Sequence, residues 1–157
     1  MLSIYIRDNH SVLNKITAVF GKRKINIDTF SARRTQYPQI IRVTITFTCL
    51  NGEIESIKDE LSGLLDTISV NLKDFENKTD YVEELLLVNV KVESYNKNIL
   101  MDYLYNNNAD IVFNGSENII SRLISSTPEI DRFVDGLCEY EIVDINRTGP
   151  INVQMEL

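Results

Sequence analysis

The sequence contains few residues that could hold a metal ion. It has one histidine, His10, and two cysteines, Cys49 and Cys138, among 157 residues. A single histidine excludes a histidine-rich metal centre, and the two cysteines are too far apart for a common metal-ligand spacing. Both cysteines lie in mostly apolar sequence, so we expect them to be buried, reduced thiols. We predict no metal site.

Long apolar runs and an excess of positive charge are also absent. No apolar stretch approaches the roughly 18 residues of a membrane span, and the first residues enter an expected strand rather than a signal peptide. The formal net charge is -7 and the pI is near 4.7, whereas a protein that binds phosphate backbones carries a basic stripe. We expect a cytoplasmic protein with no nucleic-acid partner and no membrane partner.

Segments typical of strands and helices alternate along the first half of the chain. Alternating apolar and polar residues predict strands at 2–6, 27–33, 41–47 and 67–72. Two amphipathic stretches between them have apolar residues at helical spacing, which predicts two helices and the order βαββαβ. The residues expected to point inward are Val12, Ile16, Val19 and Phe20 in the first helix, and Ile54, Ile57, Leu61 and Leu64 in the second.

The second half repeats this order after a polar segment, residues 76–80, which we predict to be a linker. Strands are expected at 85–92, 109–113, 118–123 and 140–145, and the last of these is expected to be the final strand. A proline and an acid at 128 and 129 are typical of the start of a helix. The predicted helical stripes are Ile99, Leu100, Tyr103 and Leu104, followed by Ile130, Phe133, Val134 and Leu137.

These patterns predict an α+β protein of two tandem ferredoxin-like (βαββαβ) domains, at residues 1–75 and 81–157. Each domain would be an antiparallel sheet with helices on one face, so the other face would stay open. Pairing within the chain or across a dimer covers such a face or extends a sheet edge. We therefore expect a homodimer.

The polar loop from Arg7 to Ser11 lies between the first strand and the first helix, a place that suits a small zwitterion. A helix N-terminus offers amide donors to an α-carboxylate, polar side chains offer oxygens to an α-ammonium, and apolar neighbours offer a shallow pocket. The candidate ligand-binding residues are Asp8, Asn9, His10, Ser11, Val12, Leu13, Asn26 and Ile27. The alternative is structural: the loop residues only cap the helix, Asn26 only ends it, and His10 is only exposed.

A catalytic role is the least favoured interpretation. An acylphosphatase-like enzyme on this fold would need a glycine-rich, phosphate-binding loop containing an arginine after the first strand. Arg7 is in place, but the loop has no glycine and contains Asp8, whose charge would repel phosphate. Paired carboxylates and Ser/His or Cys/His combinations are also missing, so we predict no catalytic residues.

Several residues match a known family in a register that needs no gap. They are Leu13, Phe20, Arg23, Asn26, Ile27, Pro38 and the run 42–45, with further likeness at 82–88, 142–144 and 147–150. On these residues the chain resembles the regulatory (small) subunit of acetolactate synthase (acetohydroxyacid synthase), whose N-terminal half is an ACT domain.

The resemblance implies a noncatalytic subunit in the biosynthesis of valine, leucine and isoleucine. It implies that the chain binds valine, or a related branched-chain amino acid, at an ACT dimer interface, activates the catalytic (large) subunit and confers feedback inhibition. The catalytic subunit would hold thiamine diphosphate and magnesium, so no cofactor is expected here. A stand-alone ACT-type amino-acid sensor, with no acetolactate synthase partner or with a silent valine site, is the alternative.

Three departures from the family pattern bear on the ligand site. Asn26 matches the ligand-binding asparagine of the family, and Asp8 stands where the family usually has asparagine. Ser11 and Lys24 stand where the family usually has glycine. Glycine lets a ligand approach the backbone closely and adopts left-handed conformations, so tight valine binding does not follow from the resemblance alone.

Overall fold

The computed structural model describes residues 1–50, 52–73 and 80–154, and the chain divides into two compact units. The first unit runs to Asp80 and the second is Tyr81–Val153. Most of the predicted linker, residues 76–79, lies outside the described residues, while Asp80 already begins a strand. In the described part of the chain, no helix is both long enough and apolar enough to cross a bilayer.

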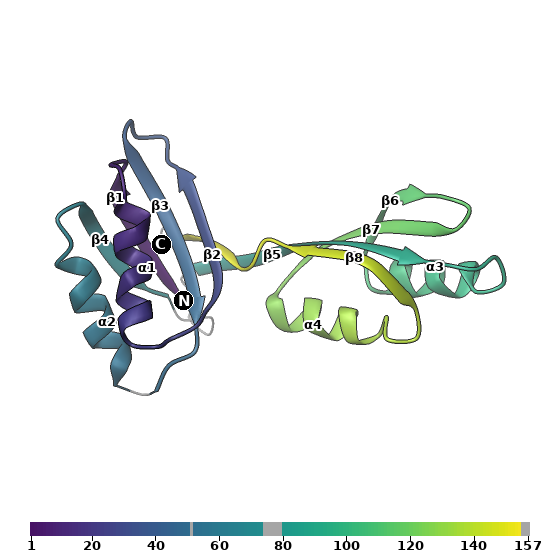
Figure 1. The fold of residues 1–157 in the computed structure, drawn as a ribbon. Helices are drawn as coiled ribbons and strands as arrows, with labels where there is room; N and C mark the ends of the chain where they lie inside the picture. The colour runs from purple at the N-terminus through teal and green to yellow at the C-terminus, as the bar shows by residue number, and fades with distance from the viewer. Residues whose placement is uncertain (51, 74–79, 155–157) are drawn as a thin grey trace. The chain divides into compact units, whose positions relative to one another are not determined.

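The first unit is a four-stranded antiparallel sheet with both of its helices on one face (Figure 1). The strand order β2-β3-β1-β4 is that of a ferredoxin-like fold, as predicted. In chain order its elements are β1 (Leu2–Arg7), α1 (Val12–Lys22), β2 (Ile27–Arg34), β3 (Ile40–Phe47), α2 (Glu53–Ser62) and β4 (Thr67–Leu72).

The core of the first unit forms where the apolar face of each helix meets the sheet. Strand register sets the sheet side of this core, because cross-strand partners such as Ile4 and Val43 share one face and are both fully buried. The predicted inward face of α1 is confirmed, since all four of its residues are at most 2% exposed. The buried apolar residues are Leu2, Ile4, Ile6, Val12, Ile16, Val19, Phe20, Val43, Ile45, Ile57, Leu61 and Val70.

The second unit repeats the arrangement with one added strand. Its sheet order is β6-β7-β5-β8, again with the ferredoxin-like topology, and β9 pairs with β5. The elements are β5 (Asp80–Lys91), α3 (Lys97–Asn106), β6 (Asp110–Asn114), β7 (Asn118–Ser125), α4 (Thr127–Asp135), β8 (Glu141–Arg147) and β9 (Ile151–Gln154). Its separate core includes Leu86, Val88, Val90, Leu100, Leu104, Ile119, Ile130, Phe133 and Leu137.

An ion pair at the edge of this second core joins β5, β8 and α4. Glu84 is only 2% exposed, and its two carboxylate oxygens accept hydrogen bonds from Arg147 Nε (2.7 Å) and a terminal nitrogen (3.0 Å). Thr127 also donates to Glu84 (2.9 Å), and Arg147 reaches Asp131 at 2.7 Å. Glu84 is the main reason that the pKa of Arg147 is raised.

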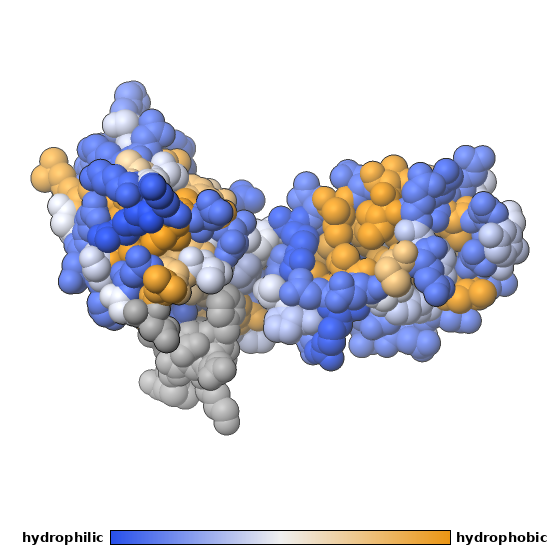
Figure 2. All heavy atoms as spheres, turned by 60° about the horizontal axis from the view of Figure 1, so that its bottom comes forward, coloured by the Kyte–Doolittle hydropathy of each residue, from blue (hydrophilic) through white to orange (hydrophobic). Residues whose placement is uncertain are grey.

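Apolar side chains remain on the surface of both units among mostly hydrophilic ones (Figure 2). In the second unit, Leu87, Phe113 and Ile124 are 40–51% exposed. Leu87 and Ile124 alternate with the buried residues of β5 and β7, and Phe113 pairs with Ile120 on the same side of the sheet. All three therefore lie on the face that carries no helix. This is the open face that the fold prediction anticipated.

Three details of the prediction are wrong. Strand 140–145 is not the last one, because β9 follows it. The apolar pattern does not predict β9, since its buried residue is Asn152, whereas Ile151 and Val153 are exposed. Ile99 is 61% exposed because the core-facing side of α3 is set by Leu100 and Leu104. Cys138 is exposed in the turn after α4, where Leu137 takes the core position, and Cys49 is half-buried; both are free thiols.

Candidate functional site

The loop between β1 and α1 is held from two sides by backbone hydrogen bonds. The Asp8 amide donates to the carbonyl of Gln39 in the β2–β3 turn (2.8 Å). The Arg7 amide donates to the carbonyl of Asp66 in the α2–β4 turn (2.9 Å). Two turns that are distant in the sequence therefore fix the start of the loop.

Asp66 also fixes the loop through its side chain, which is 8% exposed. Its carboxylate accepts hydrogen bonds from Asn9 Nδ2 (2.5 Å) and from Lys15 Nζ on α1 (3.2 Å). These two bonds, that of Asn9 first, hold the pKa of Asp66 below its ordinary value of 3.8. Because the amide nitrogen of Asn9 is engaged, its oxygen is the atom available to a ligand.

The start of α1 is not capped in the way the sequence suggested. Ser11 occupies the cap position but has φ = 63°, and its side chain makes no capping hydrogen bond. Effective caps adopt extended backbone geometry, which this left-handed residue does not. Asp8 pairs with Arg34 (3.1 Å) and Asn9 with Asp66, so these two side chains do not cap the helix either.

The missing cap leaves hydrogen-bond donors at the helix start. Within the described residues, the backbone amides of Leu13 and Asn14 have no hydrogen-bond partner. First-turn amides of this kind, together with the positive end of the helix dipole, form an anion site. The loop can therefore offer a carboxylate two amides and an ammonium group the oxygens of Asp8 and Asn9.

A cavity of about 430 Å³ lies beside this loop. Two of the candidate residues, Asp8 and Asn9, line it together with the adjoining Arg7. The other lining residues come from sequence-distant segments: Pro38, Gln39, Ile40 and Ile68. Val12 does not contribute a side chain, because it is buried in the core at 2% exposure. His10 and Ser11 are exposed and Leu13 is half-buried.

The remaining predicted residues, Asn26 and Ile27, lie at the opposite end of α1. The strand register shows this separation. Ile27, at the start of β2, pairs with Phe47 at the end of β3. Arg34, at the end of β2, pairs with Ile41, which also pairs with Ile6 just before the loop. The 11-residue helix α1 separates the two groups. Within one chain, the structure does not bring the loop and Asn26 together.

Both positions where the resemblance implies glycine adopt left-handed backbone geometry. Ser11 has φ = 63° and Lys24 has φ = 55°. Lys24 follows the end of α1, where its amide donates to the carbonyl of Gly21 (3.1 Å) and the chain turns toward β2. A residue with a Cβ is strained in this region, and glycine is not.

We therefore predict that Lys24→Gly stabilises the first unit. The free energy of unfolding should rise by about 1 kcal/mol, because glycine adopts positive φ without steric cost. Lys58→Gly is the matched control, since Lys58 lies inside α2 and the same change there should cost about 1 kcal/mol. Hydrogen exchange at buried amides of β1 measures both; a loss of stability in Lys24→Gly would show that the turn needs the lysine side chain.

Comparison with known proteins gives the same family over both units. Residues 2–69 match the family model described as "AHAS small subunit-like ACT domain", and residues 83–156 match "Small subunit of acetolactate synthase". The first unit is thus an ACT domain, and the protein is of the ACT-domain class. Together the two models cover nearly the whole chain.

Curated relatives and a solved structure agree with these matches. The acetolactate synthase small subunits of Mycolicibacterium smegmatis and Bacillus subtilis are 21% and 24% identical to the chain, covering 97% and 95% of it and 88% and 86% of their own lengths. The crystal structure of the small subunit from Thermotoga maritima has the same fold, with a TM-score of 0.87 at 18% identity over 99% of this chain and 96% of that one. The chain belongs to the acetolactate synthase small-subunit family and is a regulatory subunit.

Sequence reasoning missed the residues that hold the loop in place. Asp66, Lys15, Arg34 and Gln39 were not among the candidates, although all four contact it directly. Asp66 could have been found from strand pairing, because the residue just before β4 must lie beside the end of β1 in this topology.

Proposed function

We propose that this chain binds valine, or a related branched-chain amino acid, and thereby regulates a catalytic acetolactate synthase subunit. In the absence of the amino acid it activates that subunit, which carries the thiamine diphosphate chemistry, and in its presence it confers feedback inhibition. The proposal places both proteins in the cytoplasm. It rests on the family and on one feature of the first unit, the free edge of β2.

The edge of β2 suggests how the two halves of the effector site meet. In the described residues β2 pairs only with β3, so its other edge is open. If β2 pairs antiparallel with β2 of a second copy, the Ile27 end of one strand lies beside the Arg34 end of the other. Arg34 is paired with Asp8. A two-fold homodimer therefore sets Asn26 of one chain beside the loop of its partner.

The chemistry of such a composite site fits an α-amino acid. The free amides at the start of α1 would take the carboxylate, with about 0.3–1 kcal/mol from the helix end. Asp8 and Asn9 would take the ammonium group with Asn26 from the partner, and Leu13 and Ile27, both half-buried, would border the aliphatic side chain. The Asp8–Arg34 pair has side chains 33% and 85% exposed, and such exposed pairs are weak, so a ligand can displace the arginine.

Binding between two chains would bias one dimer arrangement over another. A coupling free energy of about 1–3 kcal/mol would change the activity of the catalytic partner severalfold or more. The apolar open face of the second unit, with Leu87, Phe113 and Ile124, supports further pairing of this kind.

Co-purification with the acetolactate synthase catalytic subunit of the same genome, followed by assay with and without valine, tests the proposal. Stimulation that valine reverses is the expected result. Stimulation without a valine effect would support the regulatory role and show that valine is not the effector of this chain. Restored inhibition by valine in the Ser11→Gly variant would then show that the serine side chain blocks the site. Absence of any interaction would favour a stand-alone amino-acid sensor.

A further inference from the structure

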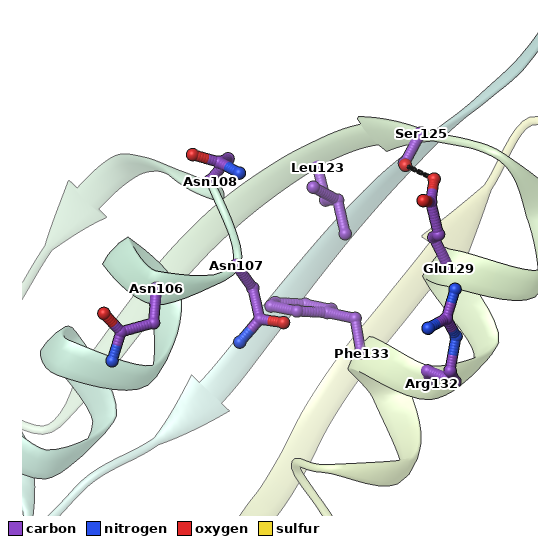
Figure 3. Close-up of a pocket in the computed structure, with 8 residues that line it drawn as sticks. All are labelled: Asn106, Asn107, Asn108, Leu123, Ser125, Glu129, Arg132 and Phe133. Carbon is purple, nitrogen blue, oxygen red and sulfur yellow. Dashed lines mark hydrogen bonds between the residues drawn. The ribbon is translucent and has the colours of Figure 1, made fainter.

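The second unit contains a small polar cleft that the proposed regulation does not use. Its volume is about 250 Å³, and it lies between the end of α3, the end of β7 and the exposed side of α4 (Figure 3). Leu123 and Phe133 lie at its base, and both are almost buried, at 6% and 1% exposure. Polar side chains of α4 and of the α3–β6 turn form the walls.

The turn after α3 presents an acceptor to this cleft. α3 ends at Asn106, and Asn108 adopts φ = 56° to redirect the chain into β6. Asn107 Nδ2 donates to the carbonyl of Tyr103 (2.8 Å), which fixes the side chain and leaves its oxygen as the free atom. Figure 3 shows Asn107 opposite the ring of Phe133.

On the other wall, α4 carries an anion and a cation one turn apart. One oxygen of Glu129 accepts hydrogen bonds from the hydroxyls of Ser125 and Ser126, and these bonds lower the pKa of Glu129, so it is ionised. Arg132 Nε donates to the carbonyl of Pro128 (3.3 Å). Across the described ranges, the second oxygen of Glu129 and the two terminal nitrogens of Arg132 have no hydrogen-bond partner.

We propose that this cleft binds a small hydrophilic amino acid, such as serine, in its zwitterionic form. Arg132 binds the α-carboxylate through its terminal nitrogens, a geometry that guanidinium groups favour. Glu129 and the Asn107 oxygen bind the α-ammonium group. Because Leu123 and Phe133 are nearly covered, an aliphatic ligand side chain would gain little contact, and the volume lies below the usual 300–1,000 Å³ of drug-sized pockets. The class of ligand thus differs from that of the ACT site.

A titration of the full-length, isotope-labelled chain with L-serine tests this assignment by NMR. We expect saturable shifts of the Asn107 side-chain amide and the Phe133 backbone amide, with a Kd in the millimolar range, about -4 kcal/mol of binding free energy. Propionate, ethylamine and L-valine serve as probes that each lack one part of the proposed ligand. All three should shift these signals less than L-serine does at the same concentration.

Variants assign the binding to the cleft. Arg132→Gln should weaken L-serine binding by about tenfold or more, because it removes a charge-assisted pair, and Glu129→Gln should weaken it independently. Arg122→Gln, an exposed arginine of the same unit outside the cleft, should leave the Kd unchanged. The assignment fails if L-serine causes no saturable shift, if Arg132→Gln and Glu129→Gln bind normally, or if propionate or L-valine binds as tightly. It also fails if Asn26→Ala, in the first unit, abolishes the response.

Discussion

Asn26→Ala is expected to raise the Kd for valine by about 10–100-fold, because hydrogen bonds to charged groups contribute about 1.5–3 kcal/mol. Asn26 is exposed in this chain and makes no hydrogen bond with the other described residues. Its replacement should therefore leave the fold and stability of the first unit unchanged. Inhibition of the catalytic partner by valine should disappear, while activation in the absence of valine stays.

Isothermal titration with valine, together with the activity assay, measures both effects. Asn71→Ala is the matched control, since Asn71 is exposed on β4, on the far side of the sheet from β2. It should bind valine like the unaltered chain. Unchanged valine affinity in Asn26→Ala would mean that Asn26 only joins α1 to β2.

Arg147→Ala is expected to lower the free energy of unfolding of the second unit by about 2–3 kcal/mol. The change leaves the carboxylate of Glu84, which is 2% exposed, with Thr127 alone. A buried charge that has lost its partner costs far more than a lost surface pair. The value lies just below the roughly 3–5 kcal/mol of fully buried pairs, because the Arg147 side chain is itself 31% exposed.

Native-state hydrogen exchange at the buried amides of β5 measures this loss, since these amides exchange only when the unit opens. Arg122→Ala removes an arginine from an ion pair whose side chains are 45% and 65% exposed, and it should cost under about 1 kcal/mol. Equal losses of unfolding free energy in the two variants would show that the Arg147–Glu84 pair contributes no more than an exposed ion pair. Exchange in the first unit should not change in either case.

The fold could be predicted because its helices and strands carry strong periodic patterns. The apolar residues at helical spacing in α1 and the apolar–polar alternation in β3 each determine which face of the element is buried. The order βαββαβ then allows only a few sheet topologies. β9 could not be predicted in this way, since a four-residue strand whose buried residue is Asn152 reverses the usual pattern. Ile99 shows a second limit, because neighbouring apolar residues on a short helix do not all reach the core.

The candidate site could be predicted only in part, for two physical reasons. The polar loop and Asn26 are visible in the sequence, but the contacts that hold the loop come from Asp66, Gln39 and Arg34, which are neighbours only after folding. The backbone of Ser11 is equally hidden, since serine before a helix normally predicts an extended cap rather than a left-handed residue. Glycine, which the resemblance implies at this position, adopts such geometry without strain.

The central claim is that the effector site forms between two copies of the chain, with the loop from one and Asn26 from the other. Asp8→Lys, which would repel the ammonium group, and Asn26→Ala should each weaken valine binding by about tenfold or more when present in both copies. Neither variant alone should then bind valine at concentrations near the Kd of the unaltered chain. In heterodimers of the two variants, one site carries both changes and the other carries none. Valine titration of a co-refolded equal mixture should therefore recover about one intact site per four chains, because half of randomly paired two-fold dimers are mixed. If the mixture binds no more valine than the separate variants, the site does not form between two copies.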